Sequence, residues 1–270
     1  MIQEIKNHKY NLYYKNIKPE SDDYVLCYKN GVVLLNEDKT LIKYKDCLGK
    51  KVYFGFMIDE KPYFIMLENI DKFEFPINIF REYEPSYLGF AIITGYHLYN
   101  FYKNNIYCGK CGNEFIHSNN LRSLKCKCGN EIFPTIAPAV IIGLLNKNHD
   151  KIMLTKYING KNYALVAGYN EIGETLEETV IREVKEEVGL NVNKIKYYKS
   201  QPWGLSGSIL SGFWADISDI DDTPTLELDE LKFGKWFSKD EIDIDNDFIS
   251  LTREMIDYFK NGNEIDLWWD

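Results

Sequence analysis

The part of this sequence that most constrains its fold is residues 168–190, where a glycine-marked loop leads into a two-faced helix. The stretch reads GYNEIGETLEETVIREVKEEVGL. Thr175 with Glu178 three residues later predicts a capped helix start, and Gly189 predicts its end. Aliphatic side chains recur every four residues between these ends, at Leu176, Val180, Val184 and Val188. This spacing predicts a helix with one face buried against a core.

Three glutamates of the same helix gather beside its apolar face. At about 100° of rotation per residue, Glu183, Glu186 and Glu187 point to one side. Carboxylates this close repel one another unless a cation neutralises them. Mg²⁺ takes oxygen ligands and often binds substrate phosphates as well. A solvated acidic helix face is the alternative, but the spacing of the glycines, Arg182 and the glutamates favours a metal site.

The spacing of these residues is also that of a known motif. Residues 168–190 follow the pattern G-x5-E-x7-R-E-U-x-E-E-x-G-U, in which U is a bulky aliphatic residue. Every fixed position of the Nudix box is present, so the chain resembles the Nudix hydrolases. That resemblance implies a mixed sheet between helices and metal-dependent cleavage of a nucleoside diphosphate linked to another group. It does not identify the substrate.

Four of the six cysteines form two short-spaced pairs ahead of the box. Cys108 and Cys111 are a Cys-x2-Cys pair, and Cys126 and Cys128 follow as a Cys-x-Cys pair, with fourteen residues between the pairs. Four thiolates arranged in this way suit a tetrahedral structural zinc ion. Because the second pair is one residue shorter than usual, four free thiols are the alternative.

Charge and composition limit the partners of the chain. Its 270 residues include 32 basic and 41 acidic side chains, for a net charge of -9. Broad electrostatic binding to nucleic acid needs clustered basic residues, whereas a small phosphorylated substrate can be held through metal ions. The N-terminal residues lack the apolar run of a signal peptide, and the longest apolar runs, such as 139–145, are too short to span a bilayer. We therefore expect a cytoplasmic protein without a membrane partner.

A second motif points to one branch of the Nudix family. Residues 200–203 read SQPW and look like the start of the SQPWPFPxS signature of the NADH pyrophosphatases, or NAD diphosphatases. The four-cysteine ribbon and Phe133-Pro134 ahead of the first Nudix strand are also similar, and the resemblance covers about residues 90–260. Residues 204–208 read GLSGS, so Ser208 alone matches the second half of the signature. Gly204 and Gly207 predict a flexible loop and weaker discrimination between substrates.

The resemblance implies a set of site residues. The candidate bases are Glu186 and Glu230. The metal ligands would be the Ala167 carbonyl, Glu183, Glu186, Glu187 and Glu230. The substrate contacts would be Phe133, Tyr169, Gln201, Pro202, Trp203, Ser208 and Thr252. Phe133 and Tyr169 would stack on a flat base, or they are ordinary core aromatics. Glu174 and Arg182 would form a structural ion pair.

The expected fold class is α+β, in three parts. Residues 1–105 form a β-rich domain with hairpins at 24–35 and 51–67 and a closing helix at 88–103. Residues 106–134 form the zinc ribbon, and residues 135–270 form the Nudix domain. Nudix strands are expected at 139–145, 151–157, 163–167, 192–200, 209–217 and around 235–237. The last helix is expected at 247–260, with Leu267, Trp268 and Trp269 packed back onto the fold.

The expected activity is hydrolysis of the pyrophosphate of NADH or NAD⁺ to AMP and nicotinamide mononucleotide. The resemblance implies Mg²⁺ or Mn²⁺ for catalysis, structural Zn²⁺, a dinucleotide substrate and a homodimer. One alternative is a Nudix pyrophosphatase acting on ADP-ribose, a dinucleoside polyphosphate or NAD-capped RNA 5′ ends. Another is a non-catalytic regulator that binds a nucleotide, against which the complete glutamate set argues.

Overall fold

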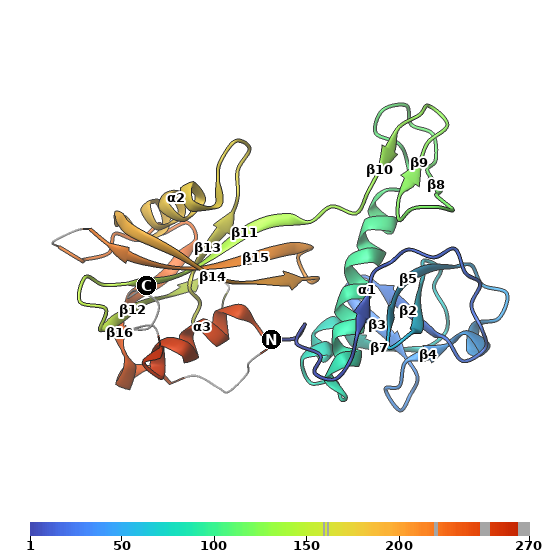
Figure 1. Cartoon of the computed structure of the whole chain (residues 1–270), viewed down its shortest axis with the longest axis horizontal. Coiled ribbons are helices and arrows are strands. Elements are labelled where there is room, and N and C mark those ends of the chain that lie inside the picture. The colour runs from blue at the N-terminus through green and yellow to red at the C-terminus, as the bar shows by residue number, and fades with distance from the viewer. Residues whose placement is uncertain (159, 161, 219–220, 244–248, 264–270) are drawn as a thin grey trace. The chain divides into compact units, whose positions relative to one another are not determined.

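The structure is a computed structural model that describes the chain except residues 159, 161, 219–220, 244–248 and 264–270. The chain divides into two compact units (Figure 1). The N-terminal unit comprises Ile2–Ile136 and Gly204–Gly207, and the C-terminal unit comprises Met1, Ala137–Trp203 and Ser208–Asp270. The expected boundaries at residues 105 and 134 stay a prediction.

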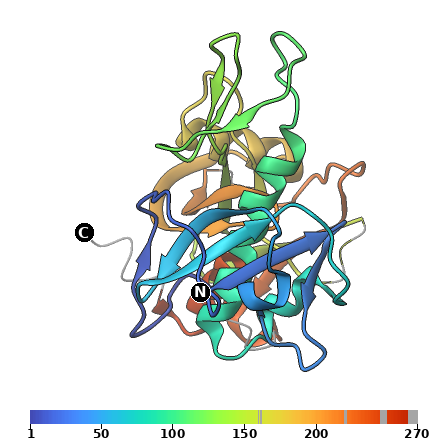
Figure 2. The same ribbon diagram turned by 90° about the vertical axis from the view of Figure 1, so that its right-hand side faces the viewer.

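The N-terminal unit contains a sheet whose strands are blue and cyan in Figure 2. The strand order is β1-β5-β6-β2-β3-β7, with β4 paired to β2. Its strands are Tyr10–Asn11 (β1), Tyr24–Lys29 (β2), Val32–Leu35 (β3), Ile42–Lys43 (β4), Val52–Ile58 (β5), Lys61–Met66 (β6) and Phe73–Pro76 (β7). Both predicted hairpins are confirmed. Asn30 and Gly31 turn β2 into β3 with φ angles of 46° and 81°, as a type I′ turn requires. Asp59 and Glu60 turn β5 into β6 with φ angles of 50° and 63°.

Helix α1, Ser86–Asn104, packs on this sheet and extends the helix predicted at 88–103 by a few residues. Tyr28 of β2 donates a hydrogen bond from its buried hydroxyl to the Ile92 carbonyl at 2.6 Å. A Cβ added to Gly95 would overlap the Tyr28 hydroxyl and a methyl group of Leu26. The absence of a side chain at Gly95 therefore leaves room for these two residues of the sheet. Two short 3₁₀ turns complete this part, Tyr44–Cys47 (η1) and Ile77–Arg81 (η2).

A small three-stranded ribbon follows α1 in the described part of the same unit. Its strands pair antiparallel in the order β10-β9-β8. They are Ile116–His117 (β8), Leu124–Lys125 (β9) and Glu131–Ile132 (β10). The two cysteine pairs lie in the turns before β8 and between β9 and β10.

The C-terminal unit is built on a mixed sheet in the order β14-β15-β11-β12-β16, with β13 paired to β11. The β11–β15 pair is parallel and the other pairs are antiparallel. The strands are Ala137–Leu145 (β11), Lys151–Tyr157 (β12), Val166–Tyr169 (β13), Val192–Trp203 (β14), Ser208–Ile217 (β15) and Leu231–Ser238 (β16). The helical elements are Leu176–Val188 (α2), Lys239–Glu241 (η3) and Leu251–Lys260 (α3).

The sheet of the C-terminal unit has a helix on each face (Figure 1). Successive side chains of a strand point to opposite faces. Val140, Ile142 and Leu144 of β11 accordingly pack with α2, whereas Ile141 and Leu145 pack with α3. The α2 residues in that core are the aliphatic ones predicted from the sequence, Val180, Val184 and Val188, with Leu176 partly buried beside them. The expected α+β fold, with a mixed sheet between helices, is confirmed.

Several elements of the C-terminal unit differ from their predicted limits, and β16 is Leu231–Ser238 where a strand was expected around 235–237. Strand β13 lies at 166–169 and not at 163–167, because Ala164 makes only an isolated bridge to Thr155. Strand β14 continues to Trp203, which pairs with Ser208 of β15 across a turn. In that turn Gly207 has a φ of 71°, a conformation that favours glycine.

Helix α3 begins at Leu251, later than predicted, because the Ser250 hydroxyl caps it by accepting a hydrogen bond from the Arg253 amide. The earlier part of the predicted helix, 247–248, lies outside the described residues, and so do Leu267, Trp268 and Trp269. None of the helices in the described ranges is long and apolar enough to cross a membrane.

Candidate active site

Local hydrogen bonds set both ends of α2, the helix that carries the predicted carboxylates. The Thr175 amide donates to the Glu178 carboxylate at 2.7 Å, and the Glu178 amide donates to the Thr175 hydroxyl at 3.1 Å. This is the predicted capping box, which satisfies backbone donors that the first helical turn leaves open. Gly189 ends the helix with a φ of 74°. The rotational position of every glutamate on α2 is fixed as a result.

Arg182 connects the loop before α2 to the carboxylates on the helix. Its guanidinium binds both carboxylate oxygens of Glu174, at 2.6 and 3.0 Å, and donates to the Tyr169 carbonyl at 2.9 Å. The same side chain donates to Glu183 at 2.7 Å and to Glu186 at 2.9 Å. The hydrogen bonds from Arg182 lower the pKa of Glu174 to about 2. The predicted Glu174–Arg182 ion pair is present, and the further contacts of Arg182 were not predicted.

Gly168, the first residue of the box, lies directly against Glu183. A Cβ added to Gly168 would overlap the Glu183 carboxylate, although the backbone at this position has no positive φ. Glycine is therefore required here for space and not for backbone conformation. Glu183 is 9% exposed, and this burial raises the pKa of its carboxyl, while the Arg182 guanidinium acts in the opposite direction.

Glu187 is the most deeply buried of the predicted metal ligands, with 2% exposure. Its Oε1 lies 3.4 Å from the Ala167 amide and 3.3 Å from the Tyr157 hydroxyl, both of which can donate to it. Its Oε2 is buried and has no hydrogen-bond partner among the residues that the structure describes. Burial raises the pKa of Glu187 to about 8, because its effect is larger than that of the opposing hydrogen bonds from Ala167 and Tyr157. A buried carboxylate oxygen without a protein partner is usually explained by a bound water molecule or ion.

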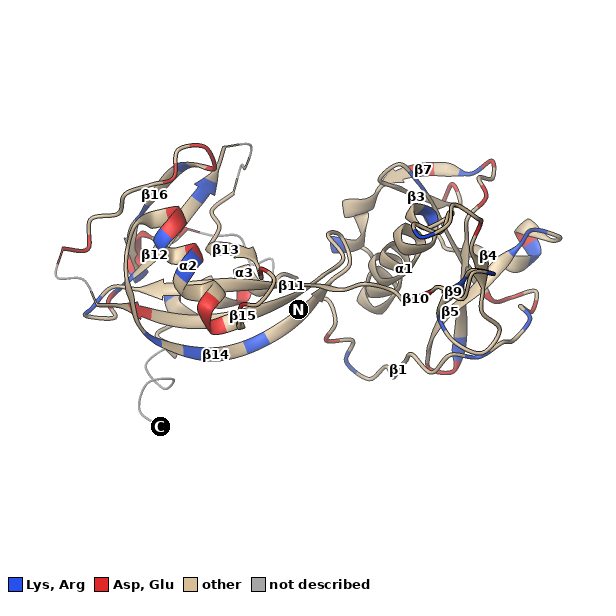
Figure 3. Ribbon diagram, turned by 90° about the horizontal axis from the view of Figure 1, so that it is seen from above, with Lys and Arg blue, Asp and Glu red and all other residues tan. Residues whose placement is uncertain are grey.

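The two candidate bases are more accessible. Glu186 has 58% of its side chain exposed. Figure 3 shows both acidic and basic residues along α2. Glu230 is exposed immediately before β16. The charge of Glu230 contributes to raising the pKa of both Glu183 and Glu187, so the four carboxylates share one electrostatic environment.

This donor set fits a hard divalent cation. Carboxylate and carbonyl oxygens are the ligands that Mg²⁺ and Mn²⁺ prefer. Glu187 offers an unpartnered buried oxygen, and the half-buried Ala167 carbonyl lies on the adjoining strand β13. Burial disfavours the charged forms of Glu183 and Glu187, and a cation beside them would reverse that effect.

Tyr157 is a member of this site that the sequence did not reveal. Its hydroxyl lies 3.3 Å from the Ala167 carbonyl and 3.3 Å from Glu187 Oε1. Burial raises the pKa of this phenol, and the Glu187 charge raises it further. Tyr157 ends a strand that contains the consecutive apolar residues Ile152, Met153 and Leu154, so the pattern alone predicts an ordinary core aromatic there.

Four of the predicted substrate contacts lie around the β14–β15 turn and β13. Tyr169 has an exposed ring, at 53% exposure, and its hydroxyl accepts a hydrogen bond from the buried Ser208 hydroxyl at 3.3 Å. The Tyr169 carbonyl is held by Arg182. Trp203 is half-buried and Pro202 is exposed, both at the end of β14. The structure thus brings Tyr169 and Ser208 together and presents an aromatic face fixed at two points.

The other predicted contacts have different surroundings. Gln201 is fully buried, its amide nitrogen donates to the Ile249 carbonyl at 2.8 Å, and its oxygen accepts from the Leu251 amide at 2.7 Å. Gln201 therefore fixes the start of α3. Thr252 is half-buried in the first turn of that helix. Phe133 is 53% exposed in the N-terminal unit.

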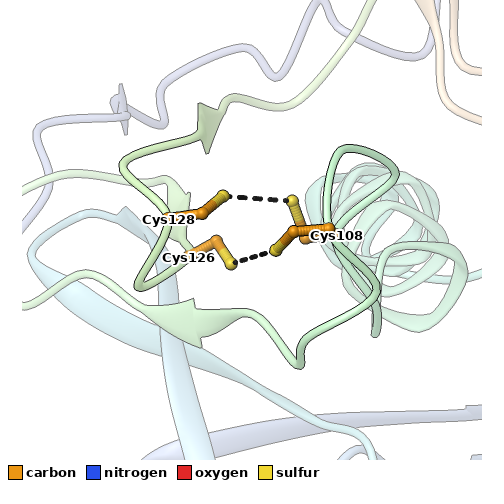
Figure 4. A group of neighbouring side chains, drawn as sticks. Cys108, Cys126 and Cys128 are labelled. Atoms are coloured by element: carbon orange, nitrogen blue, oxygen red, sulfur yellow. Dashed lines mark hydrogen bonds between the residues drawn. The ribbon is translucent and has the colours of Figure 1, made fainter.

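The four cysteines of the ribbon converge, with all four sulfur atoms within 4.8 Å of one another (Figure 4). Cys108 Sγ lies 3.8 Å from Cys128 Sγ, and Cys111 Sγ lies 3.4 Å from Cys126 Sγ. Sulfur atoms bound tetrahedrally at about 2.3 Å from zinc lie about 3.8 Å apart. The shortened second pair therefore still reaches the geometry of a four-cysteine zinc site.

Two asparagines support this cysteine cluster. Asn113 donates from its side chain to Cys111 at 3.2 Å, and Asn130 donates to Cys108 at 3.4 Å. Amide donors stabilise the thiolate form, which is the form that binds metal. Hydrogen bonds from Asn113 lower the pKa of Cys111 to about 6.

Comparisons with known proteins show which proteins this chain is similar to. The NUDIX domain model matches residues 135–259. The chain is 34% identical over 166 residues to the NAD-capped RNA hydrolase NudC of Photorhabdus laumondii, covering 60% of this chain and 63% of that protein. It is 35% identical over 156 residues to the NAD-capped RNA hydrolase NudC of Mannheimia succiniciproducens, covering 54% and 57%. The chain thus spans about six-tenths of the length of these curated relatives.

A solved NUDIX hydrolase from Nitrosomonas europaea matches with a TM-score of 0.46 and 24% identity, over 58% of this chain and 92% of that one. The box on α2, the four-cysteine cluster ahead of it and the similarity to NudC proteins point to the same family. Residues 135–259 thus form a Nudix domain, and the chain is similar to the NudC proteins.

Proposed function

We propose that this protein hydrolyses the pyrophosphate of NADH or NAD⁺, releasing AMP and nicotinamide mononucleotide, with Mg²⁺ or Mn²⁺ as the catalytic cation. The observation that carries the proposal is the buried, unpartnered Oε2 of Glu187 beside Glu183 on α2. Leaving a buried carboxylate oxygen without a partner costs free energy, and a bound cation would offset that cost.

The proposed ligands are the four glutamates and one carbonyl: Ala167, Glu183, Glu186, Glu187 and Glu230. When bound there, a divalent cation neutralises pyrophosphate oxygens and lowers the pKa of a water molecule. Glu186 and Glu230 are exposed and are the proposed acceptors of the proton of the attacking water. Arg182 keeps Glu183 and Glu186 in place through its hydrogen bonds.

The proposed substrate face begins with Tyr169. Its exposed ring is held by Ser208 through the hydroxyl and by Arg182 through the carbonyl. A fixed aromatic face of this kind stacks on a flat base with about 1–3 kcal/mol per base. The other proposed contacts are Phe133, Pro202, Trp203 and Thr252, and Gln201 acts through the start of α3.

Structural zinc in the cysteine cluster, a homodimer and a cytoplasmic location belong to the same proposal. The cysteine geometry supports zinc. The dimer rests on the family resemblance alone, and sedimentation of the purified protein would test it.

A substrate panel tests this function. Release of AMP from NADH, NAD⁺ and ADP-ribose would be measured with Mg²⁺ and with Mn²⁺. We expect NADH and NAD⁺ to be cleaved with similar kcat/KM values, because the turn after Trp203 lacks the stiffer residues of the full signature. A kcat/KM for ADP-ribose at least tenfold above NADH, about 1.4 kcal/mol of transition-state preference, would contradict the proposed substrate and leave the hydrolase chemistry standing.

NAD-capped RNA is the second candidate substrate, because both NudC relatives carry that activity in their names. A 5′-NAD-capped RNA in the same panel separates the two. If capped RNA is cleaved with a kcat/KM at least tenfold above NAD⁺, the RNA body contributes to binding and capped RNA is the preferred substrate.

A further inference from the structure

Tyr157 lies where β12 departs from its regular pairing. The register between β12 and β16 shifts between Lys156 and Tyr157, and Tyr157 pairs with Leu231 beyond the shift. Such an irregularity changes the direction in which a side chain points. The Tyr157 ring packs against the core cluster that contains the aliphatic face of α2. The apolar core therefore holds the ring while the hydroxyl reaches the candidate metal site.

The hydroxyl reaches two of the proposed metal ligands at once. It lies 3.3 Å from Glu187 Oε1 and 3.3 Å from the Ala167 carbonyl oxygen. These ligands come from α2 and β13, whereas Tyr157 comes from β12, so one phenol connects three elements. A phenol has a single hydrogen to donate, so it holds one acceptor at a time.

The hydrogen bonds of Glu187 are divided unequally between its two oxygens. Oε1 faces two donors, the Tyr157 hydroxyl and the Ala167 amide at 3.4 Å. Oε2 faces none among the described residues, although it is buried. Of these two hydrogen bonds, the longer one from the Ala167 amide would be left to hold the Glu187 carboxylate if the phenol were removed.

We propose that Tyr157 is a positioning residue for metal binding, which orients the Glu187 carboxylate so that its buried Oε2 stays free for the cation. This inference rests on the proposed function, because it takes Glu187 and Ala167 as cation ligands. A group that orients a metal ligand by a hydrogen bond characteristically affects metal affinity by about 10- to 100-fold. Because the contacts of Tyr157 are long, its effect belongs at the lower end of that range.

Direct titration with Mn²⁺ in the absence of substrate tests this role. The zinc-containing full chain would be titrated and free Mn²⁺ followed by electron paramagnetic resonance, for the parent, Tyr157→Phe, Glu187→Gln and Tyr197→Phe. Tyr197→Phe is the matched control, because it removes the hydroxyl of a tyrosine on β14 that is 54% exposed. Phenylalanine keeps the packed ring of Tyr157, so the melting temperature of Tyr157→Phe should stay close to that of the parent.

We expect Tyr157→Phe to raise the Mn²⁺ dissociation constant about tenfold. Tyr197→Phe should bind Mn²⁺ as the parent does. If Glu187→Gln loses Mn²⁺ affinity while Tyr157→Phe stays within twofold of the parent, the positioning role is wrong and the proposed metal site survives. If Glu187→Gln also binds Mn²⁺ like the parent, the proposed metal site is itself wrong.

Discussion

The protonation of Glu187 depends strongly on the surroundings of its carboxyl group. Its pKa in the folded chain is about 8, whereas an unfolded glutamate titrates near ~4.3. Between these values the folded protein holds a proton that the unfolded protein has released. The free energy of unfolding therefore falls as the pH rises from ~4.3 to about 8, unless a cation occupies the site.

Glu187→Gln should remove this pH dependence. In buffer without added Mg²⁺ or Mn²⁺, we expect the variant to melt above the parent at pH 8, because the neutral amide avoids the cost of burying a charge. Each kcal/mol avoided should raise the melting temperature by about 2–4 °C. At pH 5 the difference should nearly vanish, because the parent carboxyl is then protonated in the folded state. Thermal melts of both proteins across this pH range would check it, and a gap that grows toward acid pH would contradict the assignment.

Replacing Arg182 by lysine tests the geometry of the hydrogen-bond network around Arg182, because the positive charge is kept. Lysine keeps the positive charge but cannot bind both oxygens of Glu174 and also reach the Tyr169 carbonyl. We expect Arg182→Lys to reduce the free energy of unfolding by about 1–2 kcal/mol. Lys185→Arg on the exposed side of the same helix is the control. Equal denaturation midpoints for the two variants would argue against a structural role for the Arg182 network.

Individual residues were predictable where they lie close together in sequence. The Thr175–Glu178 capping box and the Glu174–Arg182 ion pair involve spacings of three and eight residues, and both are present. Tyr157 contacts Glu187 across thirty residues, and an aromatic residue at a strand end carries no sign of that contact. Gln201 was predicted as a substrate contact from its motif, and its burial at the start of α3 depends on the tertiary fold.

At the scale of elements, the β13–α2 connection combines a strand, a glycine-containing loop and a helix, and Gly168 lets the strand lie against Glu183. Gly168→Ala should displace that carboxylate and lower kcat/KM at least tenfold, with a small change in melting temperature. Gly109→Ala is a matched control, because a Cβ there meets nothing within 4 Å. Similar kinetics for the two variants would mean that the position of Glu183 does not matter for the reaction.

Elements with strong periodicity were predicted within a few residues. Helix α2 and strands β11 and β12 have continuous or regularly spaced apolar residues, which dictate both type and extent. The limits of β13 and β14 were less predictable because pairing with a neighbouring strand decides them. Strand β14 runs on through Gln201 and Pro202 because β15 continues opposite it, and the sequence of β14 alone does not contain that information.

At the scale of the whole molecule, the α+β architecture and the Nudix family followed from the pattern of the box and the cysteine pairs. The short Cys126–Cys128 spacing left free thiols as an alternative, which the convergence of four sulfur atoms makes less favourable. No sequence pattern predicted that the tip of the β14–β15 turn, Gly204–Gly207, groups with the N-terminal unit.

The ribbon should contain one zinc ion per chain, held by Cys108, Cys111, Cys126 and Cys128. Because binding to such a site contributes directly to folding free energy, Cys108→Ser should lose zinc and melt at lower temperature, with a smaller effect on kcat. Cys47→Ala removes a buried thiol outside the cluster and should keep its zinc. Metal analysis of protein purified without chelator would check this, and four freely titrating thiols with no zinc would contradict it.

We propose that the carboxylate face of α2 carries out metal-dependent hydrolysis. The most direct test is kcat for NADH with saturating Mn²⁺ in the parent, Glu186→Gln and Glu177→Gln. Glu177 is exposed on the opposite side of α2, so its variant should retain parental turnover. We predict a loss of at least about 100-fold for Glu186→Gln, since removal of a ligand or general base has effects of this order. Turnover of Glu186→Gln within threefold of the parent would contradict the claim.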